Sequence, residues 1–174
     1  MPDPETRDVV LMRWGLVPFW AKDPSIGARM INARAESVEE KPSFRNSFKH
    51  KRCLVLADGF YEWQKPTQKG GQNVPFRYLL KEGKPFAFAG LWESWKSPKD
   101  ETILSCTIIT CAANELVGKI HDRMPVILNK GNCWKWLEQR PMSELTSMLS
   151  PYPAGDMQAY PVSTRVNNRR EEDE

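Results

Sequence analysis

Apolar residues along the chain occur in short blocks and in alternation with polar residues, a pattern typical of β-strands. We expect strands over residues 9–17, 53–63, 75–80, 85–92, 104–110, 125–129 and 156–162. The segment SCTIIT, residues 105–110, is strongly β-prone. Asp58 and Gly59 interrupt the second of these strands and predict a turn or a bulge within it.

Helical spacing is confined to shorter stretches, over residues 37–52, 114–120, 132–138 and 143–150. Phe44 and Phe48 are four residues apart and would share one face of the first helix. The last two stretches each have a polar residue placed to cap the first turn. Many strands with few short helices, and no regular βαβ alternation, predict an α+β domain with a largely antiparallel, barrel-like sheet.

The chain of 174 residues has the length of one domain. Its sequence contains no internal repeat and no linker long enough to divide it. We therefore expect a single domain over residues 1–168, followed by a charged tail at 169–174. The polar segment KPTQKGGQN, residues 65–73, predicts a hairpin loop between two of the strands.

The composition, 40% hydrophobic and 27% charged, is that of an ordinary globular protein. The apolar runs are far shorter than the about 20 residues that cross a bilayer, and the first residues lack the pattern of a secretory signal. We expect no membrane contact and a cytoplasmic location in association with the nucleoid. The net charge of +3 permits nucleic-acid binding without arguing for it. Seven tryptophans offer faces on which bases can stack.

Positive charge is concentrated in the segment KPSFRNSFKHKR, residues 41–52, which contains five lysines and arginines and no acid. Each of these side chains could contact a phosphate and make binding sensitive to salt. The same run is also typical of a solvated helix face, and His50 within it fits that interpretation.

Several common chemistries lack their sequence signatures. The four cysteines, Cys53, Cys106, Cys111 and Cys133, form no CxxC pair, and only two histidines are present, so we expect no metal site. Mostly apolar surroundings predict that these cysteines are small buried hydrophobes rather than activated thiols. The serine motif G-x-S-x-G and a phosphate-binding glycine loop are both absent, and we expect no cofactor.

Two residues are candidates for acid–base chemistry. His121 precedes a predicted strand in KIHDRMPVIL, and histidine is the side chain that ordinarily titrates near neutrality. Glu62 lies between Tyr61 and Trp63, so a strand would place its carboxyl on the face opposite to both rings. Aromatic surroundings can raise the pKa of a carboxyl until it holds and passes a proton. Structural roles also fit: a hydrogen-bonded loop for His121, and an outward strand position for Glu62.

A third group of polar residues alternates in MINARAES, residues 30–37. Asn32, Arg34 and Glu36 would point to one side of an extended segment. Asparagine can orient a carbonyl or a hydroxyl, and arginine can fork onto a phosphate. A salt-bridged turn accounts for the same residues.

Seven motifs, taken in order, resemble the SOS-response-associated peptidase family, abbreviated SRAP. They are RWGLVPFW, INARAES, CLVLADGFYEW, FAGLWE, TIITCAAN, KIHDRMPVIL and YPVSTRVNN, and they run from about Arg13 to Asn168. The resemblance implies an SRAP-like fold and a role in the DNA damage response, shielding abasic sites in single-stranded DNA by a covalent cross-link. In this family, an N-terminal cysteine condenses through its amine and thiol with the ring-opened sugar aldehyde, which gives a thiazolidine.

The resemblance also implies roles for the residues that match. Asn32 would position the nucleophile and the sugar, Glu62 would shuttle protons, and His121 would serve the same chemistry and reversal of the cross-link. The other matches concern DNA: phosphate-contacting Arg34 and Arg123, Thr110 near the substrate, and the stacking or wedging aromatic residues Phe19, Trp20 and Trp63.

The start of the chain departs from the family pattern. Members begin Met-Cys-Gly-Arg some tens of residues before the RWG motif, whereas MPDPETRDVVLM precedes Arg13 here. We therefore expect an N-terminally truncated chain that lacks the cysteine nucleophile. After loss of Met1, Pro2 could form an iminium with an aldehyde, but without a thiol it cannot form a thiazolidine.

The sequence leaves two classes of function open. One is an abasic-site cross-linking enzyme with lyase activity, in which the peptidase of the family name trims its own N-terminus. The other is a non-catalytic module whose salt-dependent binding to single-stranded DNA changes little without Glu62 or His121. In either case we expect a monomer whose partner is single-stranded DNA that carries abasic sites.

Overall fold

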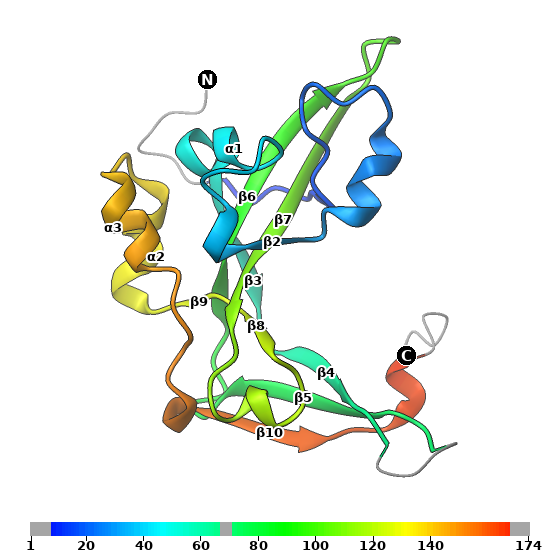
Figure 1. The fold of residues 1–174 in the computed structure, drawn as a ribbon, viewed down its shortest axis with the longest axis vertical. Helices are drawn as coiled ribbons and strands as arrows, with labels where there is room; N and C mark the ends of the chain where they lie inside the picture. Colours follow the sequence, from blue (N-terminus) through cyan, green and yellow to red (C-terminus); the bar gives the residue numbers. More distant parts are fainter. Residues whose placement is uncertain (1–7, 67–70, 168–174) are drawn as a thin grey trace.

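The computed structural model of the chain describes residues 8–66 and 71–167, and within them the strands form two hydrogen-bonded sheets (Figure 1). The larger sheet contains β1 (Arg13–Trp14), β2 (Asn32–Arg34), β3 (Arg52–Ala57), β6 (Phe86–Lys96), β7 (Thr102–Ala112), β8 (Arg123–Pro125) and β9 (Ile127–Leu128). The smaller sheet contains β4 (Phe60–Gln64), β5 (Val74–Leu80) and β10 (Met157–Pro161). In Figure 1 the smaller sheet crosses below the long β6 and β7 strands.

Strand β7 organises the larger sheet. It pairs antiparallel with β6 and β8, and parallel with β1 and β2. Strand β6 pairs antiparallel with β3 and β9, and in the smaller sheet β5 lies between β4 and β10, antiparallel to both. The predicted α+β class is confirmed. The strand order of the described residues is open, so closure into a barrel stays a prediction.

Strands β6 and β7 extend beyond the predicted 85–92 and 104–110, and they pair with each other as far as Lys96 and Thr102. The added length of β6 contains a buried charged residue. Glu93 is only 1% exposed and forms an ion pair with Lys51. Its carboxylate also accepts hydrogen bonds from the Ser94 amide at 2.9 Å and from Ser47 Oγ at 3.4 Å. These partners allow a charged residue inside a buried strand.

The interruption at Asp58 and Gly59 moves the chain from one sheet to the other. Strand β3 pairs with β6, whereas β4, which follows the interruption, pairs with β5. A Cβ on Gly59 would lie 2.8 Å from the main-chain oxygen of Tyr78, so this corner accepts only glycine without a shift. Asp58 fixes the same corner through a 2.7 Å ion pair with Arg77. The predicted turn is thus the connection that joins the two sheets.

The prediction of a strand over residues 9–17 is wrong for most of its length. Only Arg13–Trp14 forms a strand, and Leu11 is 97% exposed. Gly15 has φ of +114° and approaches Gly27 so closely that a Cβ would lie 2.5 Å from the Gly27 oxygen. The main-chain pairing with β7 ends at Gly15, whose amide still bonds to the Cys106 oxygen at 2.8 Å, and the amide of Val17 bonds at 2.8 Å to the side-chain Oγ of Ser105 in β7 instead of to its main chain.

Three helices, α1 (Arg45–His50), α2 (Lys130–Leu137) and α3 (Met142–Ser147), lie on one side of the larger sheet in Figure 1. Phe44 and Phe48 are both buried, which confirms that they share an inward face. Helix α2 begins before the predicted residue 132 because the Asn129 side chain accepts a hydrogen bond from the Asn132 amide at 2.9 Å. The predicted polar cap of α3 is wrong, since Pro141 precedes this helix without a side-chain hydrogen bond.

The basic segment 41–52 is divided between the core and the surface. Arg52 is 8% exposed, and its guanidinium donates to the main-chain oxygens of Trp136 at 2.7 Å and Glu138 at 2.6 Å. It thereby ties α2 to the end of α1, and Lys51 pairs with Glu93. The segment is therefore not a uniform solvated face.

Short 3-10 helices complete the described chain, at Pro24–Arg29, Ala35–Ser37, Val117–Lys119, Ala154–Asp156 and Thr164–Asn167. The helix predicted over 114–120 is reduced to the third of these. The predicted hairpin loop does connect β4 to β5, although its residues 67–70 lie outside the described ranges. The predicted tail at 169–174 lies outside them as well.

Candidate functional site at the junction of the two sheets

Glu62 lies on the inward face of β4, just beyond the corner that joins the sheets. Tyr61 and Trp63 are 41% and 39% exposed, whereas Glu62 is half-buried, so the carboxyl does lie opposite to both rings as predicted. Burial raises the pKa of Glu62, the adjacent His121 lowers it and Asp122 raises it, with a net rise above the ordinary value. A carboxyl in this setting can hold a proton and release it within the same reaction.

His121 lies in the turn between the 3-10 helix Val117–Lys119 and β8. Its Nδ1 is 3.0 Å from the main-chain nitrogen of Arg123, which donates a hydrogen bond to it. The same ring nitrogen is 3.5 Å from Oδ1 of Asp122. Almost half of the side chain is exposed, so the imidazole is anchored at one nitrogen and accessible to solvent.

The side chain of Arg123 is held within the protein. Its two terminal nitrogens lie 2.6 and 3.0 Å from the two carboxylate oxygens of Glu36, and one of them also donates to the main-chain oxygen of Thr110 at 2.6 Å. The hydrogen bond from Arg123 lowers the pKa of Glu36, so the carboxylate stays ionised. A bidentate arginine–carboxylate pair fixes geometry as well as charge.

Asn32 and Arg34 are both exposed in β2, and Ala33 between them is fully buried, so the predicted common side is confirmed for this pair. Glu36 is no longer in the extended segment, because Ala35–Ser37 forms a 3-10 helix. Arg34 lies opposite Thr110 in the β2–β7 register. Thr110 is 9% exposed, and its Oγ1 donates to the main-chain oxygen of Ala33 at 3.4 Å.

These contacts connect most of the predicted site residues into one arrangement that spans both sheets. Strand pairing and hydrogen bonds connect Arg34, Glu36, Thr110, His121 and Arg123, and Glu62 joins them through its charge interaction with His121; we call these six residues the junction site. Asn32 enters it as the neighbour of Arg34 on the same face of β2. The junction site combines a proton-holding carboxyl, an accessible imidazole and an exposed arginine.

The predicted aromatic residues are exposed, but they lie in different segments. Phe19 and Trp20 are 59% and 48% exposed and form a turn directly after the buried residues 15–18. Trp63 donates from Nε1 to Asn167 Oδ1 at 2.7 Å and borders an open hollow of about 550 Å³. Of the described contacts, none joins Phe19 or Trp20 to Glu62.

Sequence reasoning missed Tyr78, which lies in β5 opposite Phe60 of β4. Tyr78 is fully buried and stacks on Phe60, with ring centroids 5.0 Å apart. Its hydroxyl has no hydrogen-bond partner among the described residues. Burial raises the pKa of Tyr78, as does the negative charge of Glu62, which shows that the two side chains are electrostatic neighbours. Glu62 pairs with Phe76, so Tyr78, two residues further along β5, lies diagonally opposite Glu62. This strand spacing was the sequence feature that could have identified Tyr78.

The cysteines of the described residues are poor nucleophiles. Burial raises the pKa of Cys53 to about 12 and that of Cys111 to about 11. Burial also raises the pKa of Cys106 and Cys133. All four thiols therefore disfavour the thiolate form, as their apolar surroundings predicted. Across residues 8–66 and 71–167, no cluster of three or more histidine, cysteine or acidic side chains is placed to hold a metal.

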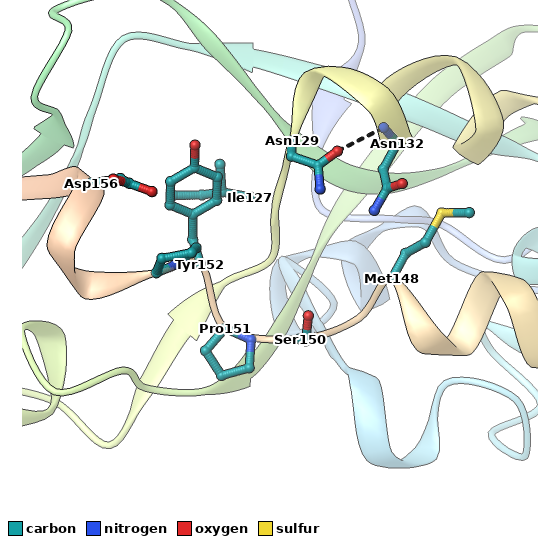
Figure 2. A pocket seen from close by; sticks show the side chains of 9 residues that line it. Ile127, Asn129, Asn132, Met148, Ser150, Pro151, Tyr152 and Asp156 are labelled. Carbon is teal, nitrogen blue, oxygen red and sulfur yellow. Dashed lines mark hydrogen bonds between the residues drawn. The ribbon is translucent and has the colours of Figure 1, made fainter.

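A second hollow lies away from the junction site, between β9, α2 and the chain that leads to β10 (Figure 2). It has a volume of about 180 Å³, and Figure 2 shows Tyr152 and Asp156 on one side of it and Asn132 and Met148 on the other. None of the predicted site residues lines it. Within the described chain, no helix has the length and apolar character that a membrane crossing requires.

The fold and the junction site together define an α+β domain with acid–base groups and cationic side chains at the meeting of two sheets. The family model described as SOS response associated peptidase (SRAP) matches residues 2–169. The chain belongs to this family.

Named relatives and a solved structure agree with this membership. "Abasic site processing protein YoqW" of Bacillus subtilis (strain 168) is 51% identical over 159 residues, which cover 90% of this chain and 70% of the relative. "Abasic site processing protein HMCES" of Xenopus tropicalis is 35% identical over 97% of this chain and 56% of its own length. A crystal structure of a Bacteroides thetaiotaomicron protein superposes with a TM-score of 0.85 at 32% identity, covering 91% of this chain and 71% of that one.

Proposed function

We propose that this domain binds single-stranded DNA at abasic sites and promotes covalent capture of the ring-opened sugar. The observation that carries the proposal is the half-buried Glu62, whose pKa burial raises, within the range of charge interaction of the accessible imidazole of His121. The names of the relatives, abasic site processing proteins, support the same substrate. The partner would be a single strand carrying an abasic site, bound in the cytoplasm at the nucleoid.

The proposed reaction needs a proton donor and a hydrogen-bond donor at one oxygen, and Glu62 and His121 suit these two tasks. The neutral amine of an N-terminal cysteine attacks the aldehyde carbon to give a carbinolamine, which loses water to form an imine when its hydroxyl is protonated. The thiol then adds to the imine carbon and its proton moves to the nitrogen, so the products are one thiazolidine and one water. Glu62 would donate the proton to the departing hydroxyl, and His121 would donate a hydrogen bond to the same oxygen.

The proposed DNA contacts are made mainly by exposed side chains. Arg34 would contact a backbone phosphate beside Thr110, and Asn32 would orient the sugar. Trp63, together with Phe19 and Trp20, offers flat faces for unpaired bases. Such contacts would tolerate any sequence, because phosphates carry no sequence information. A phosphate contact by Arg123 has less support than one by Arg34, because Glu36 already binds the Arg123 guanidinium.

Added free cysteine tests the chemistry on the 174-residue chain itself, because the first cysteine of the printed sequence is the half-buried Cys53. Abasic single-stranded DNA, free cysteine and the protein would be incubated together, and thiazolidine formation on the DNA followed by mass spectrometry. We expect the protein to accelerate the reaction, and Glu62→Gln and His121→Ala each to reduce the acceleration about a hundredfold, the first by loss of the proton donor and the second by loss of the hydrogen-bond donor at the departing oxygen. Glu82→Gln, in the turn after β5, is the matched control.

The same experiment separates the two classes of function. Normal binding of abasic single-stranded DNA without acceleration would identify a non-catalytic binding module. Without added cysteine we expect no heat-stable adduct, and a full yield of such adduct would show that another residue is the nucleophile.

Lyase and peptidase activities are part of the same proposal. Strand cleavage by β-elimination would depend on the Glu62 and His121 pair, and the peptidase activity would be confined to the protein's own N-terminus. Cleavage of an unrelated peptide would contradict that restriction. We also propose a monomer, which the mass measured by light scattering with and without DNA would check.

A further inference from the structure

The Glu36–Arg123 pair links two distant parts of the chain. Glu36 follows β2, Arg123 begins β8, and the two strands lie on opposite edges of β7. Arg123 crosses β7 by bonding to both the main-chain oxygen and the Oγ1 of Thr110, at 2.6 and 3.2 Å. Its side chain is only 20% exposed. The Arg123 side chain therefore reaches contacts on both sides of β7, while its main chain pairs with Ala112.

The main chain of Arg123 determines which nitrogen of His121 can carry a proton. The Arg123 amide lies 3.0 Å from Nδ1, and an amide N–H can only donate. This hydrogen bond requires a lone pair on Nδ1, which the neutral imidazole has when its proton is on Nε2. Two acceptors near the same nitrogen, the Arg123 carbonyl oxygen at 3.2 Å and Oδ1 of Asp122 at 3.5 Å, would favour the other tautomer. The hydrogen bond from the Arg123 amide is therefore the contact that favours Nε2–H.

We propose that Glu36 is a positioning residue that selects the Nε2–H tautomer of His121 by fixing Arg123 against Thr110. Neutral His121 then presents a hydrogen-bond donor, not a base, to a substrate oxygen. Glu62 is left as the group that gives and takes the proton, so the two residues have separate tasks. The importance of this tautomer rests on the proposed function, whereas the tautomer itself is a property of the free protein.

The tautomer can be measured directly by NMR on protein labelled with ¹⁵N at histidine, because the two ring nitrogens of neutral imidazole have distinct shifts. His121→Ala assigns the signals. We expect the wild-type ring to be the Nε2–H tautomer, and Glu36→Gln to shift the tautomer ratio about fivefold toward Nδ1–H, as for loss of one hydrogen bond. Glu40→Gln, an exposed carboxylate in the same segment, is expected to match the wild type.

A wild-type ring protonated at Nδ1 would overturn the proposal, as would an unchanged tautomer in a folded Glu36→Gln variant. If Glu36→Gln fails to fold, Arg123→Lys gives the same test, because it keeps the main-chain amide and the positive charge but loses the fork. An unchanged tautomer ratio in folded Arg123→Lys would also overturn the proposal. Neither measurement uses DNA. Failure of the proposed function would therefore leave the tautomer result intact, and failure of the tautomer proposal would leave the proposed function intact.

Discussion

Two glutamates of the junction site are predicted to affect stability with opposite signs. Folding raises the pKa of Glu62 mainly through burial, so its contribution is present at low pH and lost as the pH rises through the folded-state pKa. Folding lowers the pKa of Glu36 through the hydrogen bond from Arg123, so its contribution is present near neutrality and lost as the pH falls. The carboxyl of Glu62 thus lowers the stability of the fold when it is ionised, as is common for residues kept for function.

We expect Glu62→Gln to raise the melting temperature at pH 7, because an amide replaces a half-buried carboxylate without its desolvation cost. The gain is expected to shrink toward pH 4, where carboxyls of the unfolded chain, with pKa of about 4.3, become protonated. Glu36→Gln is expected to lower the melting temperature at pH 7, with a loss that also shrinks in acid. Thermal unfolding of the three proteins at both pH values checks this, and equal signs for the two variants would contradict it.

At the scale of elements, the corner between β3 and β4 is what brings Glu62 to His121. In Gly59→Ala, the new methyl group would meet the Tyr78 main-chain oxygen at 2.8 Å, and a backbone atom in a strand cannot move aside cheaply. We expect a loss of about 1–3 kcal/mol in the free energy of unfolding. Gly155→Ala is the matched control, because a Cβ there meets nothing within 4 Å. Urea titrations of both variants check this, and equal midpoints would refute it.

Local patterns predicted the strands and helices whose side chains alternate or repeat regularly, such as β5 and the buried pair Phe44 and Phe48. They also placed Glu62 on the face away from its aromatic neighbours. They failed where distant contacts decide: Gly15 turns against Gly27, and Glu93 is accepted inside β6 because Lys51 reaches it. The same limit hid the Glu36–Arg123 pair, whose members are 87 positions apart in sequence.

At the scale of the whole molecule, binding to single-stranded DNA should depend on a few exposed cations rather than on overall charge, since the net charge is only +3. Arg34 is exposed on β2 beside the junction site, whereas Arg140, between α2 and α3, is paired with Glu138 and Glu144. In Figure 1, α2 and α3 lie to the left of β6 and β7 and above the smaller sheet.

We therefore expect Arg34→Ala to weaken binding of abasic single-stranded DNA by a similar factor for all sequences, because a phosphate contact carries no base information. The slope of log affinity against log salt concentration should become shallower by about 0.7, the value for one lost phosphate contact on a single strand. Arg140→Ala should retain the wild-type slope, because its charge is satisfied within the protein. Fluorescence anisotropy at several salt concentrations measures both slopes. A wild-type slope in Arg34→Ala would mean that DNA follows another path across the domain.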